Sequence, residues 1–346
     1  MSQVVVITGA SAGVGRATAR RFARDGARLG LLARGQVGLE ATRREVEELG
    51  GQALAISTDV ADYAQVKHAA EQIEERFGPI DVWINNAMVT VFSPVKKMQA
   101  EEFRRVTEVT YLGAVHGTMV ALEHMQKRDQ GVILQVGSVL AYRAIPLQSA
   151  YCGAKHAIQG FSESLRSELM HDDSGISLSM VQLPALNTPQ FEWSRNKMGQ
   201  KAQPVPPIYE PEVAAEAIHW AVSETPREMS VGMRSSLILN LNKFFPGVGD
   251  RYLAENGYSS QMREEPSDPE RADNLFAPIE RDAGARGPFS DRARASSRQL
   301  WVSSHKGLLM AAAGALAAGT LLAIKGKNGK GEELPDTRSP EAHRIP

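Results

Sequence analysis

The sequence predicts an α/β fold in which helices cover both faces of a mainly parallel, doubly wound sheet. Short apolar runs, nearly continuous in Val, Ile and Leu, recur through the first 185 residues. Such runs are typical of parallel strands that are buried on both faces. Stretches with helical periodicity lie between them, and this regular alternation favours right-handed crossovers around one sheet.

The individual elements follow from the same patterns. Residues 63–77 form the clearest helix, because their apolar side chains recur on one helical face. Residues 211–223 predict another helix, with Pro211 in its first turn. The apolar runs that we predict as strands are 4–8, 28–33, 52–57, 82–85, 131–136 and 176–182. Together these elements predict one α/β domain over residues 1–258.

The composition changes after this domain. Residues 259–300 are rich in Arg, Asp, Glu, Pro, Ser and Gly, which predicts a charged, largely disordered linker. Leu275, Phe276 and Phe289 are the side chains through which part of it could dock. Residues 327–346 are polar and predict a disordered tail.

A C-terminal apolar helix is expected over residues 301–326. Its core, Gly307 to Ile324, is uncharged and is bracketed by Lys306 and Lys325. An 18-residue helix spans roughly 27 Å, slightly less than the hydrocarbon layer of a bilayer. We therefore expect a membrane anchor (a transmembrane helix) with the domain of residues 1–258 facing the cytosol. The alternative is a packing or oligomer-contact helix of a cytoplasmic protein.

The overall composition excludes several classes of protein. The chain has 39 Lys and Arg against 40 Asp and Glu, so it lacks the basic excess of a general nucleic-acid binder. Cys152 is the single cysteine, which excludes an intrachain disulfide and a cysteine metal cluster. The eight histidines show no metal-ligand spacing, and we expect no metal site.

A glycine-rich turn marks the end of the first predicted strand. It reads Thr8-Gly-Ala-Ser-Ala-Gly-Val-Gly15 and leads into a helix. Glycine permits a tight turn and a close approach to a pyrophosphate, and the helix N-terminus offers free N–H groups. This context predicts a Rossmann-like dinucleotide site, whereas the alternative is a turn without a ligand. The candidate cofactor-binding residues here are Gly9, Ser11, Gly13, Val14 and Gly15.

A second group of residues can perform acid–base chemistry. Tyr151 and Lys155 are four positions apart, so they share one face of a helix. A neighbouring ammonium favours the phenolate and is expected to lower the phenol pKa. Ser138 ends a predicted strand and can donate a hydrogen bond to the same substrate oxygen. Taken alone, the Tyr–Lys pair is also consistent with an ordinary helix-face contact.

These motifs together resemble those of the classical short-chain dehydrogenases/reductases (SDRs), over about residues 1–255. The motifs are the Gly-x-x-x-Gly-x-Gly turn, Asn85-Asn86-Ala87, Ser138 and Tyr151-x-x-x-Lys155. The resemblance implies an oxidoreductase that interconverts a carbonyl and an alcohol of a small molecule, with Tyr151 as acid/base. It also implies a homo-oligomer, and it places a variable substrate lid at residues 185–209. The alternatives are a catalytically weak dinucleotide-binding sensor and a membrane-bound scaffold.

The resemblance implies further cofactor contacts. Tyr151 belongs to the cofactor site, and Lys155 would bind the nicotinamide ribose. Thr188 would contact the carboxamide of the nicotinamide. Asp59 and Val60 match the pair that holds the adenine ring, and the remaining matching positions are Asn86, Ala87 and Pro184.

Two positions depart from the family pattern. Met88 replaces a glycine, and Thr110 takes the place of an asparagine that helps to hold a catalytic water. A threonine hydroxyl can still form hydrogen bonds, so Thr110 remains a candidate catalytic residue.

The end of the second strand predicts the cofactor. Arg34 stands where an acidic residue would accept hydrogen bonds from a free ribose 2′-hydroxyl. A guanidinium suits a 2′-phosphate, so the sequence favours NADP(H), with Arg16 as a second candidate contact. The alternative for either arginine is a solvated surface charge.

Overall fold

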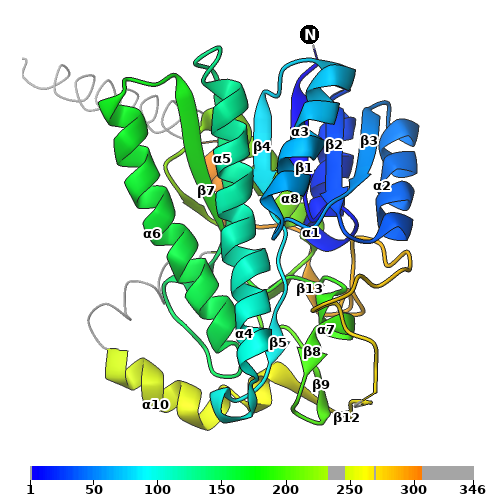
Figure 1. Cartoon of the computed structure of the whole chain (residues 1–346). Coiled ribbons are helices and arrows are strands. Elements are labelled where there is room, and N and C mark those ends of the chain that lie inside the picture. Colours follow the sequence, from blue (N-terminus) through cyan, green and yellow to red (C-terminus); the bar gives the residue numbers. More distant parts are fainter. Residues whose placement is uncertain (1, 233–245, 269, 306–346) are drawn as a thin grey trace, which may run out of the picture. The chain divides into compact units, whose positions relative to one another are not determined.

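The computed structural model describes residues 2–232, 246–268 and 270–305. Its central sheet has the strand order β11-β7-β6-β4-β1-β2-β3, and every neighbouring pair is parallel (Figure 1). This topology confirms the predicted doubly wound α/β fold. The strands are β1 (Val4–Thr8), β2 (Arg28–Ala33), β3 (Gln52–Ser57), β4 (Val82–Asn85), β6 (Gly131–Ser138), β7 (Ile176–Leu183) and β11 (Met229–Ser230).

Apolar side chains fill the space between the sheet and the helices on both faces. Phe22, Leu39 and Ile218 pack from one side, and Ile73 and Leu165 pack from the other. Figure 1 shows α5 and α6 side by side across the near face of the sheet. The first layer consists of α1 (Gly13–Ala23), α2 (Gln36–Glu48) and α8 (Pro211–Glu224). The second consists of α3 (Tyr63–Phe77), α5 (Gly113–Met125) and α6 (Ser149–His171).

Shorter elements surround this frame. A π-helical turn, η2 (Glu108–Leu112), joins α4 (Ala100–Thr107) to α5. The short helices are η1 (Val95–Lys97), η3 (Val139–Ala141), α7 (Gln190–Trp193), α10 (Pro246–Asn256) and η4 (Ser259–Gln261). The short strands are β5 (Val91–Phe92), β8 (Arg195–Asn196), β9 (Gln200–Ala202), β10 (Ile208–Tyr209), β12 (Met262–Pro266) and β13 (Ala293–Arg294).

The structure differs from the disordered linker expected at residues 259–300. Within this segment, β12 pairs antiparallel with β9, and β13 pairs parallel with β10. Leu275 is fully buried and Phe289 is 2% exposed. The few apolar residues each fill a gap in the domain, and arginines bond to backbone carbonyls, as Arg271 does to that of Ser194 (2.6 Å). Composition does not reveal such partners.

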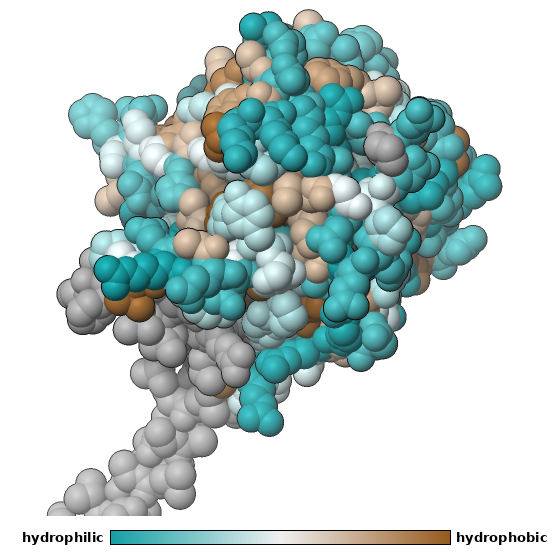
Figure 2. Space-filling model, turned by 90° about the horizontal axis from the view of Figure 1, so that it is seen from below, coloured by the Kyte–Doolittle hydropathy of each residue, from teal (hydrophilic) through white to brown (hydrophobic). Residues whose placement is uncertain are grey.

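The proposed anchor, residues 307–324, lies outside the described residues. Within the described ranges, no helix is both long and apolar enough to cross a bilayer. The chain divides into two units after Leu300. The last helix of the described residues, α11 (Arg298–Ser304), begins in the first unit and ends in the second. In the view from below, the coloured surface is mostly hydrophilic, with small scattered apolar areas (Figure 2).

Replacing Phe289 with alanine tests whether residues 259–300 belong to the folded domain. The ring packs edge-on against Phe191, with centroids 5.7 Å apart. Phe289→Ala should lower the free energy of unfolding in urea by about 3–5 kcal/mol, the usual cost of emptying a buried aromatic position. Phe276→Ala is the matched control, because that ring is 50% exposed. Equal unfolding midpoints for the two variants would contradict this packing.

Candidate active site

The turn between β1 and α1 brings two backbone segments into very close approach. Gly9 and Gly13 adopt φ values of +69° and +57°, which favour glycine. A Cβ on Gly15 would lie 2.2 Å from the Gly9 carbonyl oxygen, so no other residue fits there. No side chain caps α1, which leaves N–H groups of its first turn available to an anion.

Asn86 and Ala87 fasten the turn after β4 to the turn after β1. Their backbone N–H groups donate to the Thr8 hydroxyl at 2.9 and 3.0 Å. The Asn86 side-chain amide donates to the Thr8 carbonyl at 2.9 Å. The Asn86 amide group therefore shapes the site by holding its two turns together.

A cavity of about 200 Å³ lies at the carboxyl edge of the sheet, where ligands bind in such folds. Ten of the predicted cofactor-binding residues line it: Gly9, Ser11, Gly13, Val14, Arg34, Asp59, Val60, Asn86, Ala87 and Thr188. Gly15 and Pro184 are not among the lining residues. Gly15 instead permits the turn itself, and Pro184 follows directly after β7.

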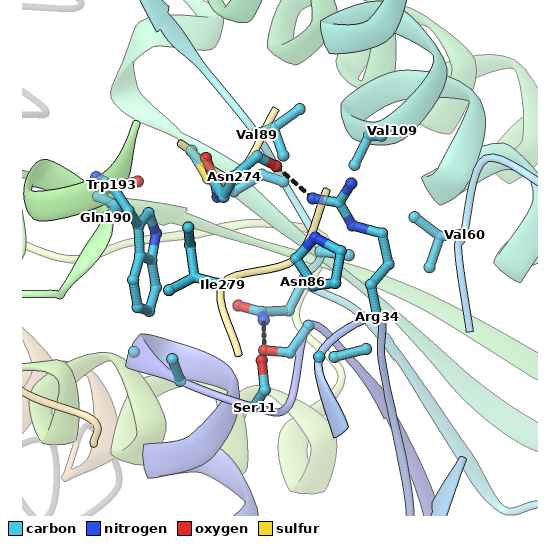
Figure 3. A pocket seen from close by; sticks show the side chains of 18 of the residues that line it. Ser11, Arg34, Val60, Asn86, Val89, Val109, Gln190, Trp193, Asn274 and Ile279 are labelled. Carbon is cyan, nitrogen blue, oxygen red and sulfur yellow. Dashed lines mark hydrogen bonds between the residues drawn. The ribbon is translucent and has the colours of Figure 1, made fainter. Parts of the chain in front are cut away.

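Several residues of the cavity wall were not among the predicted cofactor contacts. Val109 projects from η2, and Trp193 from α7. Asn274 and Ile279 come from the segment that we expected to be a linker (Figure 3). Val109 could have been suggested by its place directly before Thr110, a position that the family resemblance singles out. No sequence signal places Asn274 or Ile279 at this edge.

Arg34 reaches across the cavity to this late segment. Its Nη1 donates to the carbonyls of Leu275 (3.3 Å) and Phe276 (3.1 Å), and its Nη2 donates to the carbonyl of Asn274 (Figure 3). Burial and the neighbouring Arg105 lower the pKa of Arg34. Among the described residues, no carboxylate forms an ion pair with it. Arg34 is thus a half-buried cation whose hydrogen-bond acceptors are all neutral carbonyls.

Arg16 occupies a different position from the one we expected. Its guanidinium pairs with Glu45 through two contacts of 2.9 Å and with Asp282. The side chain is almost fully buried, and two carboxylates already satisfy it. The expectation that Arg16 assists Arg34 at a 2′-phosphate does not agree with this arrangement.

Asp59 and Thr188 lie at separate places on the cavity wall. The Asp59 carboxylate accepts from the Ala61 N–H at 3.1 Å and pairs with Arg105. Thr188 lies opposite the turn, where a Cβ on Gly13 would meet its side chain at 3.4 Å. The two residues therefore border the cavity from the β3 side and from the loop after β7.

Ser138, Tyr151 and Lys155 come together beside this cavity without lining it. Ser138 ends β6, while Tyr151 and Lys155 lie in the first two turns of α6. Ser138 lies close enough to the Tyr151 phenol to lower its pKa. The Lys155 Nζ lies 5.6 Å from the Tyr151 ring centroid and donates to the Val136 carbonyl at 2.7 Å. The spacing argument therefore placed these three side chains correctly relative to one another.

Burial controls the protonation of this group. It raises the pKa of the Tyr151 phenol above its ordinary value, although the nearby Ser138 hydroxyl opposes this effect. Burial also lowers the pKa of Lys155 to about 8. The expectation that the ammonium would lower the phenol pKa therefore differs from the structure, because desolvation has the larger effect. At neutral pH, Tyr151 is a neutral proton donor.

Thr110 takes no part in this group. Its hydroxyl donates to the Val89 carbonyl (3.0 Å) and accepts from the Val89 N–H (3.2 Å). The residue is fully buried in η2 and does not line the cavity. Thr110 thus ties η2 to the segment after β4, next to Met88, which does line the cavity.

Comparison with known proteins agrees with this geometry. The family model described as short chain dehydrogenase matches residues 3–199. The chain belongs to the short-chain dehydrogenase/reductase family. An uncharacterized oxidoreductase of Bacillus subtilis, YxnA, is 34% identical over 276 residues, which cover 79% of this chain and 78% of the relative.

Other SDR relatives carry more specific names. A fatty acyl-CoA reductase of Acinetobacter baylyi is 31% identical, over 66% of this chain and 75% of the relative. A levodione reductase of Leifsonia aquatica is 35% identical, over 57% and 74%. An alcohol dehydrogenase of Thermococcus sibiricus, solved with 5-hydroxy-NADP, superposes with a TM-score of 0.57 and 27% identity. The superposition covers 67% of this chain and 96% of the Thermococcus chain.

Proposed function

We propose that this SDR protein is an NADP(H)-dependent oxidoreductase that interconverts a carbonyl and an alcohol, with Tyr151 as the acid/base. The observation that carries the proposal is the grouping of Ser138, Tyr151 and Lys155 beside a cavity built from the glycine turn. A proton donor next to a dinucleotide site is the arrangement that carbonyl reduction requires.

The cavity suits a dinucleotide on three independent grounds. Arg34 is a cation without a carboxylate partner among the described residues, which suits a 2′-phosphate. The first turn of α1 has no side-chain cap and suits the pyrophosphate. The Asn274 Oδ1 is buried without a hydrogen-bond partner and could accept a donor of the ligand. When bound, NADP(H) supplies or accepts the hydride.

The residues of this chain perform the proton chemistry. In reduction, the neutral Tyr151 hydroxyl donates its proton to the substrate oxygen as that oxygen gains negative charge. Ser138 hydrogen-bonds to the same oxygen and stabilises the charge. Protonated Lys155 supplies a positive charge beside the phenol, which favours its release of the proton. Ser138 therefore orients the oxygen, while Lys155 assists the transfer.

Named relatives support this assignment. The reductases of Acinetobacter and Leifsonia and the NADP-analogue complex of the Thermococcus enzyme are consistent with NADP(H) and a small-molecule carbonyl substrate. Homo-oligomer formation and membrane anchoring through residues 307–324, with a cytosol-facing catalytic domain, are further proposals that rest on the sequence.

Tyr151→Phe tests the proton donor. Removing only the hydroxyl should lower turnover by at least ~10²-fold, because a positioned acid contributes on that scale. Turnover is measured with NADPH and a panel of aldehydes and ketones, while circular dichroism monitors the fold. Tyr63→Phe, on α3, is the matched control and should retain activity. Unchanged turnover in Tyr151→Phe would remove Tyr151 from its assigned role.

The pH profile tests Lys155. Burial depresses the pKa of its ammonium from 10.5 to about 8, so the charge is present below that pH and is lost above it. For carbonyl reduction, kcat/KM should therefore fall as the pH rises through about 8. An arginine at this position stays protonated above pH 8. If the Lys155→Arg variant retains activity, its kcat/KM should therefore fall only at a higher pH than that of the wild type. A wild-type profile that is level between pH 7 and pH 10 would contradict this role.

Arg34→Asp tests the cofactor preference. The affinity for NADPH should fall about ten- to a hundredfold more than the affinity for NADH, the equivalent of one hydrogen bond between charged groups. Titration of cofactor fluorescence measures both constants. NADH binding by the same variant is the internal control, because both cofactors lose the contacts of Arg34 with residues 274–276 equally. Equal losses for the two cofactors would refute a contact with the 2′-phosphate.

A further inference from the structure

A segment from far along the chain forms one wall of the dinucleotide cavity. Residues 274–284, which we call the strap, lie beyond the part of the chain that the family model matches. Asn274, Pro278 and Ile279 line the same cavity as the glycine turn. Figure 3 shows Asn274 and Ile279 facing this cavity, with Ser11 and Arg34 on other sides of it.

The strap bonds to the groups that we assign to the cofactor. Three consecutive carbonyls, from Asn274 to Phe276, accept from Arg34. The Gly284 carbonyl accepts from the Gly13 N–H at 3.2 Å, at the start of α1. A cofactor phosphate needs the same guanidinium and the same helix N-terminus, so both contacts must yield to it.

Two contacts beside the cavity complete the attachment. Asp282 pairs with Arg16, which follows directly after the glycine turn. The Glu280 carboxylate accepts from the Val37 N–H at 3.2 Å, in the first turn of α2. These bonds involve neither Arg34 nor the N–H groups at the start of α1. They hold the centre of the strap against α1 and α2.

The ends of the strap are held differently from its centre. Leu275 is fully buried, and the Asn274 N–H donates to the Trp193 carbonyl at 3.0 Å. Beyond the other end, Phe289 is buried and its N–H donates to Asn187 Oδ1 at 2.9 Å. Between these anchors, half of the Asp282 side-chain surface is exposed. The centre can therefore lift while the anchors stay in place, because exposed polar contacts contribute little stability.

We propose that the strap is a lid of the cofactor site. The strap must lift from α1 and α2 each time a dinucleotide enters or leaves the cavity. This inference rests on the proposed dinucleotide site. A phosphate forms charge-assisted hydrogen bonds with Arg34 and with α1, which are stronger than those of neutral carbonyls. Binding therefore replaces the contacts with these carbonyls, and the Asp282–Arg16 pair then holds the strap over the bound cofactor.

A reversible covalent lock tests the strap directly. A Cβ on Gly35 would lie 3.5 Å from the Pro278 Cβ, within the separation that a disulfide spans. Gly35 has a φ of −82°, so a cysteine fits its backbone, and the natural Cys152 is buried. The double variant Gly35→Cys/Pro278→Cys, made in the full chain, joins the strap to the start of α2. Each single variant is a control for the substitution itself.

The readout is the association rate of NADPH, measured by stopped-flow fluorescence on oxidised and reduced samples of the double variant. The oxidised protein should bind at least ~10-fold more slowly, and a thiol reductant should restore the rate, as expected for a covalently closed entrance. Equal rates in both states would overturn the strap proposal and leave the dinucleotide site intact. If wild-type protein binds neither NADPH nor NADH, the proposed function fails first.

Asp282→Asn provides an independent measurement without a new bond. Loss of the ion pair with Arg16 should raise the NADPH dissociation rate about two- to fivefold, the range for one partly exposed pair. Asp291→Asn is the matched control, because Asp291 is exposed and has no polar partner among the described residues. Asp282 acts through Arg16, so the dissociation rate of NADPH is the quantity that should change, and circular dichroism should show the same fold in both variants. Equal dissociation rates in the two variants would overturn the assignment of Asp282.

Discussion

The close approach between Gly15 and the Gly9 carbonyl is the constraint on which the rest of the site depends. A side chain at Gly15 would push α1 away from β1 and open the contact with Asn86. Because the chain turns so tightly there, both the turn and the first residues of α1 line the cavity. The residues after β2, β3, β4 and β7 then gather around one point, since parallel strands end at the same edge.

The sequence predicted this frame well because the sheet is buried on both faces. Each strand consists of consecutive apolar residues, so its existence could be predicted without knowing its neighbours. β1 to β4 have the predicted bounds, while β6 continues to Ser138 and β7 to Leu183. The extra residues are Gly137 and Ser138 in β6 and Leu183, next to Pro184, in β7, and pairing between the two strands, rather than composition, keeps them extended.

Other features depend on partners that local sequence does not reveal. The burial of Leu275 requires the core on the side of α3, α5 and α6, and that of Phe289 requires Phe191 of α7 and Ile208 of β10, all far away along the chain. Arg16 resembles a free surface charge until folding brings Glu45 and Asp282 to it. The phenol of Tyr151 has Lys155 nearby, as its position predicts, but the depth of burial outweighs that charge. In each case a tertiary contact overrides a correct local pattern.

The anchoring of the strap on α7 has a consequence for the order of events in catalysis. Asn274 bonds to the Trp193 carbonyl, and Asp273 pairs with Arg195 at 2.7 Å directly after α7. This helix lies in residues 185–209, where the family has its substrate lid. If residues 185–209 hold the substrate, as the family resemblance implies, the anchored end of the strap contacts the substrate segment, and the coupling between the two ligands would be reciprocal. A substrate that fixes α7 would also hold the nucleotide, so release should follow a compulsory sequence with the nucleotide last.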